Sequence, residues 1–194
     1  MYNLLFATSN AHKVEEIKQF FAESPVNIVS LLDYPDIPEA PEPFETFEEN
    51  AEAKATFIFQ RTGVTVISDD SGLEVEALHG RPGVFSKRYS AEGTAEANNE
   101  KLLREMENQD NRSAQFVCVL AIHTGEETRF IRGVCKGSIA DRLSGKGGFG
   151  YDPLFLPDEY PGRSMADLSM AEKNLISHRG RALEQLKQQL STFK

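Results

Sequence analysis

A short apolar segment that runs directly into two acidic residues constrains this chain more than any other feature. Val64 to Ser68 has the composition of a short buried strand, and Asp69, Asp70, Ser71 and Gly72 follow it. Neighbouring carboxylates repel each other, and burying them without a partner is costly. A cation relieves both problems, and Mg²⁺ is the usual cation at oxygen-only sites that also hold phosphates. The alternative is a solvent-exposed Asp-Ser-Gly turn, and these residues alone leave both interpretations open.

The size and composition of the chain indicate a globular protein of one domain. It has 194 residues, of which 40% are hydrophobic and 26% charged, so a real core can form. No apolar stretch approaches the roughly 20 residues of a membrane span, and the first residues lack the features of a signal peptide. The cysteines are Cys118 and Cys135 only, so we expect reduced thiols and a cytoplasmic protein.

The net charge of −9 narrows the expected partners. It argues against a protein that coats nucleic acid or lies on a membrane surface. We therefore expect neither nucleic acid nor a membrane as a partner. A nucleotide substrate remains compatible with this charge, because a small cationic pocket can lie in an acidic surface.

Predicted strands and helices alternate in the first part of the chain, and a strand hairpin follows in the middle. Apolar spacing and capping residues predict helices at 11–22, 46–62, 94–108 and 177–190, with a short helix beginning at 169. Strands are predicted at 2–7, 27–31, 64–68, 73–77, 114–122 and 129–139. This order predicts an α/β fold with a mixed sheet in one domain.

One candidate anion site lies where the first strand meets the first helix. Thr8, Ser9 and Asn10 form a polar turn, and Lys13 follows in the first helical turn. Free backbone N–H groups, hydroxyls and an ammonium group would then converge on one point, as they do at phosphate sites. A lysine in this position opposes the helix dipole, and a bound phosphate would reverse that effect. The alternative is an ordinary capped helix with a solvated lysine.

A second candidate lies at the start of the last helix. Ser177 is the expected N-cap, and His178 and Arg179 follow it, with Lys173 shortly before. Donor groups at a helix N-terminus oppose the dipole unless a negative or carbonyl-rich ligand is bound. The alternative is an ordinary cap in which Arg179 pairs with a nearby glutamate.

Two loops complete the set of candidates. In the glycine-rich loop, Phe149 and Tyr151 offer aromatic faces for stacking with a base, and Asp152 offers an acceptor for a base N–H. The alternative is a loop whose aromatic side chains fill the edge of the core. Glutamates of the acidic loop, Glu39 to Glu45, could complete a metal site with Asp69 or Asp70, whereas a solvated loop is the more common case.

Together these segments resemble the inosine triphosphate pyrophosphatase family, whose members are also called XTP/dITP diphosphatases. The resemblance extends over nearly the whole chain, and it rests on six motifs in the family's order. The motifs are Phe6-Ala7-Thr8-Ser9-Asn10-Ala11-His12-Lys13, Thr46-Phe47-Glu48-Glu49-Asn50-Ala51, Ser68-Asp69-Asp70-Ser71-Gly72-Leu73, Gly80 to Tyr89, Gly148-Phe149-Gly150-Tyr151-Asp152-Pro153, and Glu172-Lys173-Asn174 with Ser177-His178-Arg179-Gly180. Each motif alone would be weak, whereas six in order are specific.

The resemblance implies a fold and a reaction. The implied fold is an elongated α/β domain over residues 1–194, with a mixed central sheet, two lobes and a deep substrate cleft. The implied protein is a homodimer that depends on Mg²⁺. It hydrolyses ITP, dITP or XTP to the monophosphate and pyrophosphate, which keeps deaminated purines out of nucleic acids.

Matched position by position, the resemblance also implies the site residues. Asp70 would be the general base and a metal ligand, and Ser71 would contact the substrate. The phosphate-binding residues would be Thr8, Ser9, Asn10, Ala11, His12 and Lys13. The base pocket would consist of Phe149, Gly150, Tyr151, Asp152, Lys173, His178 and Arg179.

Three departures from the family's pattern limit this transfer. The acidic loop lacks the usual Glu-Glu-Thr-Gly, and counting back from Thr46 favours Glu42 as the second metal ligand, with Glu39 as the fallback. Lys87 stands where the family usually has alanine, and the sequence does not explain its role. Asp167 stands where the family usually has glutamate.

The expected mechanism follows from these positions. Asp70, or a metal-bound hydroxide that it orients, would activate water for in-line attack on the α-phosphorus, and Lys13 would neutralise phosphate charge. A 6-oxo group that accepts from His178 or Arg179 would distinguish the substrate from adenine nucleotides, whereas guanine shares that group. Two other readings stay open: a septum-type nucleotide pyrophosphatase with another base preference, and a non-catalytic nucleotide-binding protein. The intact Asp69-Asp70 pair argues against the second.

Overall fold

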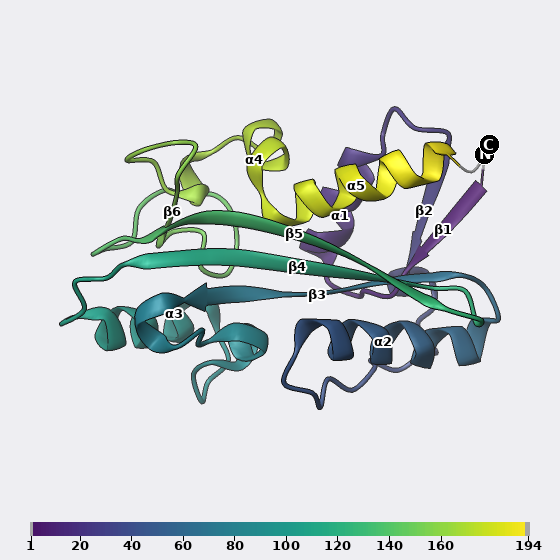
Figure 1. Cartoon of the computed structure of the whole chain (residues 1–194), viewed down its shortest axis with the longest axis horizontal. Coiled ribbons are helices and arrows are strands. Elements are labelled where there is room, and N and C mark those ends of the chain that lie inside the picture. Colours follow the sequence, from purple (N-terminus) through teal and green to yellow (C-terminus); the bar gives the residue numbers. More distant parts are fainter. Residues whose placement is uncertain (1, 193–194) are drawn as a thin grey trace. The chain divides into compact units, whose positions relative to one another are not determined.

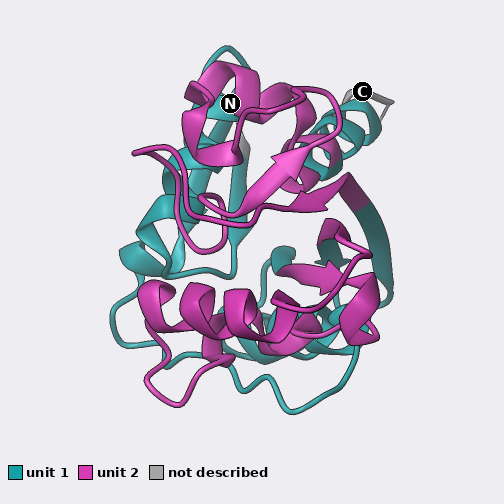
Figure 2. Ribbon diagram, turned by 90° about the vertical axis from the view of Figure 1, so that its left-hand side faces the viewer, with its two compact units in different colours: residues 1–70, 118–132, 182–194 teal, residues 71–117, 133–181 magenta. Residues whose placement is uncertain are grey.

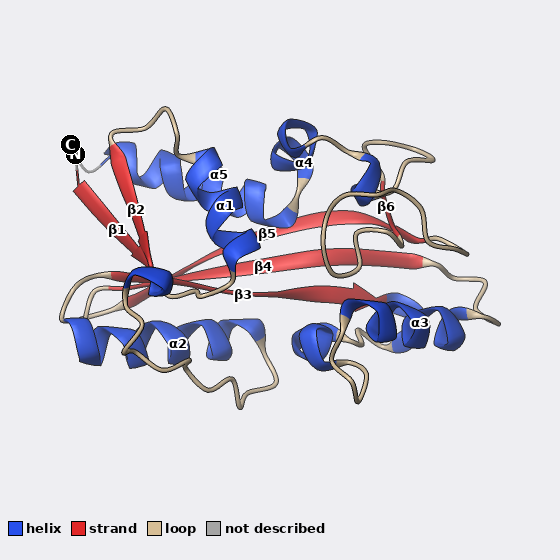
Figure 3. Ribbon diagram, turned by 180° about the vertical axis from the view of Figure 1, so that it is seen from behind, coloured by secondary structure: helices blue, strands red, loops and turns tan. Residues whose placement is uncertain are grey.

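The computed structural model describes residues 2–192, and Figures 1 and 3 show its helices and strands. The strands are β1 (Tyr2–Phe6), β2 (Val26–Ser30), β3 (Val66–Val75), β4 (Ser113–His123), β5 (Thr128–Ile139) and β6 (Phe155–Pro157). The helices are α1 (Ala11–Phe20), α2 (Phe47–Thr62), α3 (Ala95–Met106), α4 (Met170–Ile176) and α5 (His178–Thr192). Short 3₁₀ turns lie at Leu31–Asp33, Glu76–Leu78, Gly83–Arg88 and Met165–Asp167. Every helix in this described part is too short or too polar to cross a bilayer.

The described strands form a sheet in the order β2-β1-β3-β4-β5-β6. β1 pairs in parallel with both β2 and β3, whereas β5 and β6 are antiparallel. A tight turn joins β4 to β5, in which the Thr124 backbone N–H donates to the Glu127 carbonyl at 3.1 Å. The predicted α/β class and the mixed sheet are therefore confirmed.

The chain divides into two compact units, which Figure 2 shows in different colours. Unit 1 holds the residues up to Asp70, the segment Cys118–Arg132 and the residues from Ala182 on. Unit 2 holds Ser71–Val117 and Gly133–Arg181. The boundaries fall within β3, β4 and β5, so each of these strands contributes residues to both units.

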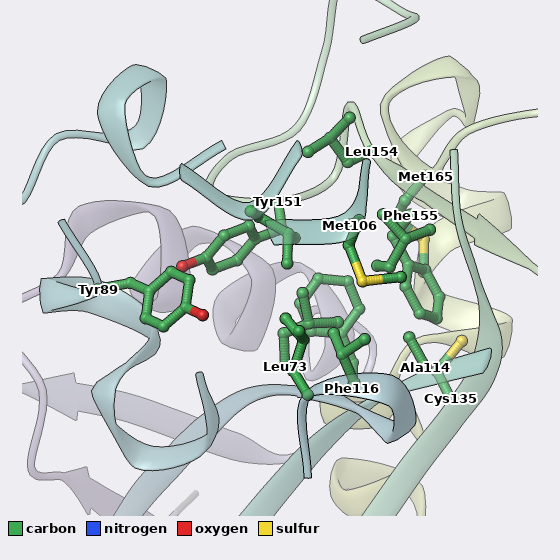
Figure 4. Packing of buried hydrophobic residues seen from close by; sticks show 14 of the residues in the cluster. Leu73, Tyr89, Met106, Ala114, Phe116, Cys135, Tyr151, Leu154, Phe155 and Met165 are labelled. Carbon is green, nitrogen blue, oxygen red and sulfur yellow. The ribbon is translucent and has the colours of Figure 1, made fainter. Parts of the chain in front are cut away.

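Each unit has a hydrophobic core of its own. In unit 1, Phe6 and Ile67 of the sheet pack with Ile17 of α1 and Leu183 of α5. In unit 2, side chains of the sheet pack with those of α3 and of the 139–176 region, and Figure 4 shows this cluster from close by. Full burial of one such large side chain stabilises the fold by about 1.5–3 kcal/mol, so both units contribute to stability.

The ends of α2 follow from local sequence. The Thr46 hydroxyl caps the first turn by accepting from the Glu49 backbone N–H at 3.2 Å. Gly63 ends the helix in the left-handed conformation, with φ of 67°, which a glycine adopts without steric cost. The helix predicted over 46–62 is therefore confirmed, and its two caps fix where it presents its side chains to β3.

The structure overturns one local prediction at the most informative segment. Residues Val66–Val75 form one continuous strand, whereas the sequence predicted a turn at 69–72 between two shorter strands. Asp69 and Asp70 are buried, with exposed fractions of 3% and 6%, so the solvent-exposed turn is wrong. Gly72 serves close packing instead, because a Cβ added to it would lie 2.2 Å from the Gly83 carbonyl oxygen.

Candidate functional site

The two adjacent carboxylates of β3 each meet a lysine from a different helix of unit 1. Side chains alternate between the faces of a strand, and α1 and α2 lie on opposite sides of β3 (Figure 3). Lys13 Nζ of α1 lies 2.8 Å from Asp69 Oδ2. Lys54 Nζ of α2 lies 3.5 Å from Asp70 Oδ1. The two carboxylates therefore face different helices, and both are paired with cations.

Lys54 is a residue that the sequence reasoning missed. It is buried, and its Nζ donates to Glu42 Oε1 at 2.8 Å and to the Asp69 carbonyl at 2.5 Å. Burial lowers its pKa, but the surrounding carboxylates outweigh burial and raise the pKa above its ordinary value. The side chain is therefore charged. The available signal was its spacing, because Lys54 lies with Ala51 and Ile58 on the buried stripe of α2, where a lysine is unusual.

Asp70 has the properties of a cation ligand. Its Oδ2 is buried and makes no hydrogen bond within the described residues. Burial raises the pKa of this carboxyl group, and the nearby Lys54 charge acts in the opposite direction. A buried carboxylate with one unsatisfied oxygen is costly, and a divalent cation would satisfy that oxygen.

The donor set around Asp70 fits Mg²⁺. Within residues 2–192, no group of three or more His, Cys, Asp or Glu side chains is arranged to hold a metal. Mg²⁺ at phosphate sites, however, usually takes only one or two carboxylates and completes its shell with phosphates and water. Asp70 and Glu42 both contact the Lys54 ammonium, so they already surround a common cation. Glu39 instead accepts from the Ser9 hydroxyl at 2.9 Å, which favours Glu42 as the second carboxylate.

The backbone N–H groups of the turn before α1 already have hydrogen-bond partners within the turn. Asn10 Oδ1 accepts from the backbone N–H groups of His12 and Lys13, at 3.0 and 3.4 Å. The Thr8 hydroxyl accepts from the Asn10 N–H at 3.2 Å. These first-turn N–H groups are therefore not free, in contrast to the prediction. Ala11 and His12 are exposed.

In unit 2, the start of α5 meets the middle of β3. Arg179 is buried, and its Nη2 donates to the Ser71 hydroxyl at 3.1 Å. His178 is also buried, and its ring stacks on Phe116 with centroids 4.9 Å apart. The Ser177 hydroxyl accepts from the Gly180 N–H at 3.0 Å, so the predicted N-cap is confirmed. The structure thus brings Ser71 and Arg179 together, although they are far apart in the sequence.

The glycine-rich loop of unit 2 is tied to α4. Lys173 Nζ donates to Asp152 Oδ2 at 2.9 Å and lies 4.5 Å from the centroid of the Phe149 ring. The same carboxylate oxygen accepts from the Phe149 backbone N–H at 2.8 Å. Asn99 Nδ2 of α3 donates to the Gly150 carbonyl at 2.9 Å. Phe149 is half-buried, so one aromatic side chain remains partly accessible beside a lysine and a carboxylate.

Tyr151 follows the alternative given for the glycine-rich loop, in which aromatic side chains fill the core, and it does not fit the base-stacking role. Its side chain is 4% exposed and belongs to the core of unit 2 (Figure 4). Its hydroxyl donates to the Ser86 carbonyl at 2.9 Å. Tyr151 therefore cannot offer its ring for stacking with a base, because the core already covers it.

A family model identifies the chain on independent grounds. The model of the Ham1 family matches residues 4–189, which is nearly the whole sequence. The chain belongs to the Ham1 family. The resemblance inferred from the six motifs is thereby confirmed.

Curated relatives and solved structures agree with this assignment to the Ham1 family. A protein of Oceanobacillus iheyensis named dITP/XTP pyrophosphatase is 48% identical over 100% of both chains. One of the same name from Caldanaerobacter subterraneus is 45% identical, covering 97% of this chain and 96% of the relative. The solved Ham1 protein of Staphylococcus aureus has 38% identity and a TM-score of 0.88, covering 99% of this chain and 100% of that one. The solved Ham1 protein of Coxiella burnetii has 37% identity and a TM-score of 0.89, covering 99% of this chain and 100% of that one.

Proposed function

We propose that this chain is a nucleoside-triphosphate pyrophosphatase that hydrolyses ITP, dITP and XTP to the monophosphate and pyrophosphate. Membership of the Ham1 family and the activity in the names of its end-to-end relatives support the proposal. The observation in this chain that carries it is the group of Glu42 with the buried Asp70 and Lys54, beside the Lys13–Asp69 pair. Such a density of buried ionisable groups is expected where a polyanion binds.

The lysines of unit 1 would receive the phosphates. Lys13 is the more accessible one, with 17% of its side chain exposed and its ammonium on Asp69. Its ammonium group can leave the Asp69 carboxylate and bind a phosphate oxygen without moving through the hydrophobic core. Lys54 is more deeply buried and holds the carboxylates of Glu42 and Asp70 in place. Together the two ammonium groups offset part of the charge that four ionised oxygens of a triphosphate bring.

Asp70 is the residue that would handle the proton. Its Oδ2 has an open acceptor position, so it can accept a proton from the attacking water. Burial raises its pKa, which makes it a stronger base than an exposed aspartate. Asp70 and Glu42 would hold Mg²⁺, which supplies charge neutralisation on the phosphate oxygens when it is bound.

The residues of unit 2 would recognise the base. Arg179 and His178 offer donors to a 6-oxo group, and adenine presents a donor there instead of an acceptor. A buried donor left unmatched is what makes a hydrogen-bonding site selective. Phe149, which lies beside Lys173, offers the aromatic face.

A substrate panel with detection of pyrophosphate tests this proposal. We expect ITP and XTP to be hydrolysed far faster than ATP or GTP, with pyrophosphate as the first product. Orthophosphate as the first product, or equal turnover of ATP and ITP, would contradict it. Preference for another nucleotide would point to a septum-type pyrophosphatase, and binding without turnover would point to a non-catalytic protein.

The proposal includes a Mg²⁺-dependent homodimer in the cytoplasm. The family resemblance supports the dimer, and the two buried cysteines, Cys118 and Cys135, which are thiols and not disulfide-bonded, agree with a reducing compartment. Analytical ultracentrifugation tests the dimer, and a titration of activity with EDTA and then Mg²⁺ tests the metal. A monomer at working concentration, or full activity in EDTA, would refute the corresponding part.

A further inference from the structure

One side of the glycine-rich loop is held by the 3₁₀ turn at Met165–Asp167 and the serine before it. The Gly147 N–H donates to the Ala166 carbonyl at 3.1 Å. The Ser164 hydroxyl donates to the Ser144 carbonyl at 3.0 Å. This turn therefore fixes the first half of the loop, the half that leads to Phe149.

The other side of the loop is held by α4. Lys173 Nζ donates to Asp152 Oδ2 at 2.9 Å and lies over the Phe149 ring. The position of Lys173 depends on its helix, whose first turn is closed by a capping box between Ser169 and Glu172. The second half of the loop is therefore fixed through α4.

Arg163 joins these two supports. Its Nη1 donates to Glu172 Oε1 at 3.0 Å, and its Nη2 donates to the Asp167 carbonyl at 2.8 Å. Glu172 is the residue before Lys173 on α4, and Asp167 closes the turn that holds Gly147. The planar guanidinium of Arg163 thus sets the distance between the two segments that contact the glycine-rich loop.

This arrangement contributes little to stability by itself. The side chains of Arg163 and Glu172 are 43% and 33% exposed, and ion pairs with such exposure are screened by water and salt. Arg163 stabilises the fold only weakly, but its two hydrogen bonds link the turn at Met165–Asp167 to α4. Such a contact is suited to fixing the position of these two segments relative to each other. Small displacements of positioned groups are known to reduce catalysis and binding strongly.

We propose that Arg163 is a positioning residue for base recognition, which holds Phe149, Asp152 and Lys173 in the arrangement that binds a deaminated purine. This inference rests on the proposed function and adds a residue to it. Arg163 does not touch the substrate and acts through the turn at Met165–Asp167 and through α4. Its removal should therefore affect the base and leave the phosphates unaffected.

The two products of the reaction separate these effects without requiring turnover. Calorimetry on the full chain would measure the dissociation constants of IMP and of pyrophosphate with Mg²⁺, for wild type and Arg163→Ala. We expect IMP to bind about tenfold more weakly, which corresponds to about 1.4 kcal/mol, and pyrophosphate to bind unchanged. The KM for ITP should rise with little change in kcat. Arg163→Lys should lie between the two, because one ammonium cannot serve both partners.

Arg132→Ala is the matched control. Arg132 pairs with Glu48 at 2.7 Å, and their side chains are 42% and 41% exposed. The substitution therefore removes an ion pair that is as exposed as that of Arg163 but lies in unit 1. It should leave IMP binding unchanged. Unchanged IMP binding in both Arg163 variants, or an equal loss of pyrophosphate binding, would overturn the inference while leaving the proposed function intact. A wild-type protein that binds no IMP and hydrolyses no ITP would overturn both.

Discussion

Lys54 lies where the carboxylates of Asp70 and Glu42 would otherwise repel each other. At the scale of single residues, this makes Lys54→Met informative, because it keeps the apolar stem and removes the charge. Breaking a buried ion pair from one side typically costs about 3–5 kcal/mol, so we expect the free energy of unfolding in EDTA to fall by that order. Because a divalent cation would take the place of the ammonium, Mg²⁺ should restore part of the loss.

Urea unfolding with EDTA and with millimolar Mg²⁺ measures both effects. Lys18→Met, at an exposed position of α1, is the control for removing a lysine. A Lys54→Met variant as stable as the control would show that Lys54 is not needed to hold the carboxylates. A variant that Mg²⁺ fails to rescue would argue against a metal position at Asp70 and Glu42.

The second prediction at this scale concerns Asp70→Asn. The change keeps the shape of the side chain and removes the base and metal ligand, so turnover of ITP should fall at least about 10²-fold. Folding should survive, because Lys54 keeps Glu42 and the Asp69 carbonyl as partners, and because burial disfavours the ionised carboxylate of Asp70 and raises its pKa. We expect an unchanged or higher melting temperature in EDTA.

Asp69→Asn is the matched comparison for Asp70→Asn, since Asp69 pairs with Lys13 instead. We expect it to reduce turnover less. If Asp69→Asn were inactive and Asp70→Asn nearly normal, the roles within the pair would be inverted. If both were active, the chemistry would lie elsewhere.

At the scale of elements, β3 shows what local sequence could and could not predict. Its apolar start was evident, but the acidic pair and Gly72 have the local preferences of a turn. What keeps the strand extended comes from distant residues: Lys13 and Lys54 on two helices. The Ser71–Arg179 contact could not be predicted for the same reason, because its two residues lie far apart in the sequence. The caps at Thr46 and Ser177 were predictable, because their partners lie within three residues.

The start of α4 gives a prediction for pH dependence. The hydrogen bond from Arg163, followed by those from Ser169, lowers the pKa of Glu172 from 4.5 to about 2. A carboxyl group whose pKa is lower in the folded state stabilises that state above its unfolded pKa. This contribution is therefore present above pH 4.5 and is lost as the pH falls towards 2.

Glu172→Gln should accordingly flatten the acid side of the stability profile. Melting temperatures between neutral pH and about pH 2–3 measure this, with the exposed Glu126→Gln as the control for removing a carboxylate. Wild type and Glu172→Gln should differ at neutral pH and converge on acidification. Parallel profiles would show that the charge of Glu172 contributes nothing to folding through its hydrogen bonds with Arg163 and Ser169.

At the scale of the whole molecule, the sequence predicted the mixed α/β sheet and the family, because six motifs in order and alternating elements are global signals. It could not predict how the chain divides. The boundaries of the two units lie inside β3, β4 and β5, where neither composition nor a linker marks them. The sequence offered two roles for the aromatic side chains of the glycine-rich loop, base stacking or filling of the core, and it could not predict that Tyr151 takes the second, because its partners in the core lie far along the chain.

Because three strands contribute to both units, we expect the chain to unfold in a single cooperative transition. Leu183 lies in the core of unit 1 and Leu102 in that of unit 2, and both are almost completely buried. Replacing either by alanine should cost about 2–5 kcal/mol. If the strands couple the units, each substitution should shift the whole transition.

The tyrosines allow this coupling to be measured. The chain has no tryptophan and 5 tyrosines, of which Tyr89, Tyr151 and Tyr160 lie in unit 2 and Tyr2 and Tyr34 in unit 1, so tyrosine fluorescence weights unit 2 more strongly than unit 1. Far-UV circular dichroism reports on both units. Under urea, Leu183→Ala in unit 1 should therefore shift the fluorescence midpoint as far as the dichroism midpoint, and the two curves should coincide as they do for wild type. A fluorescence curve whose larger step stays at the wild-type midpoint while the dichroism splits into two steps would show that the units unfold independently, and that continuous strands alone do not make this chain cooperative.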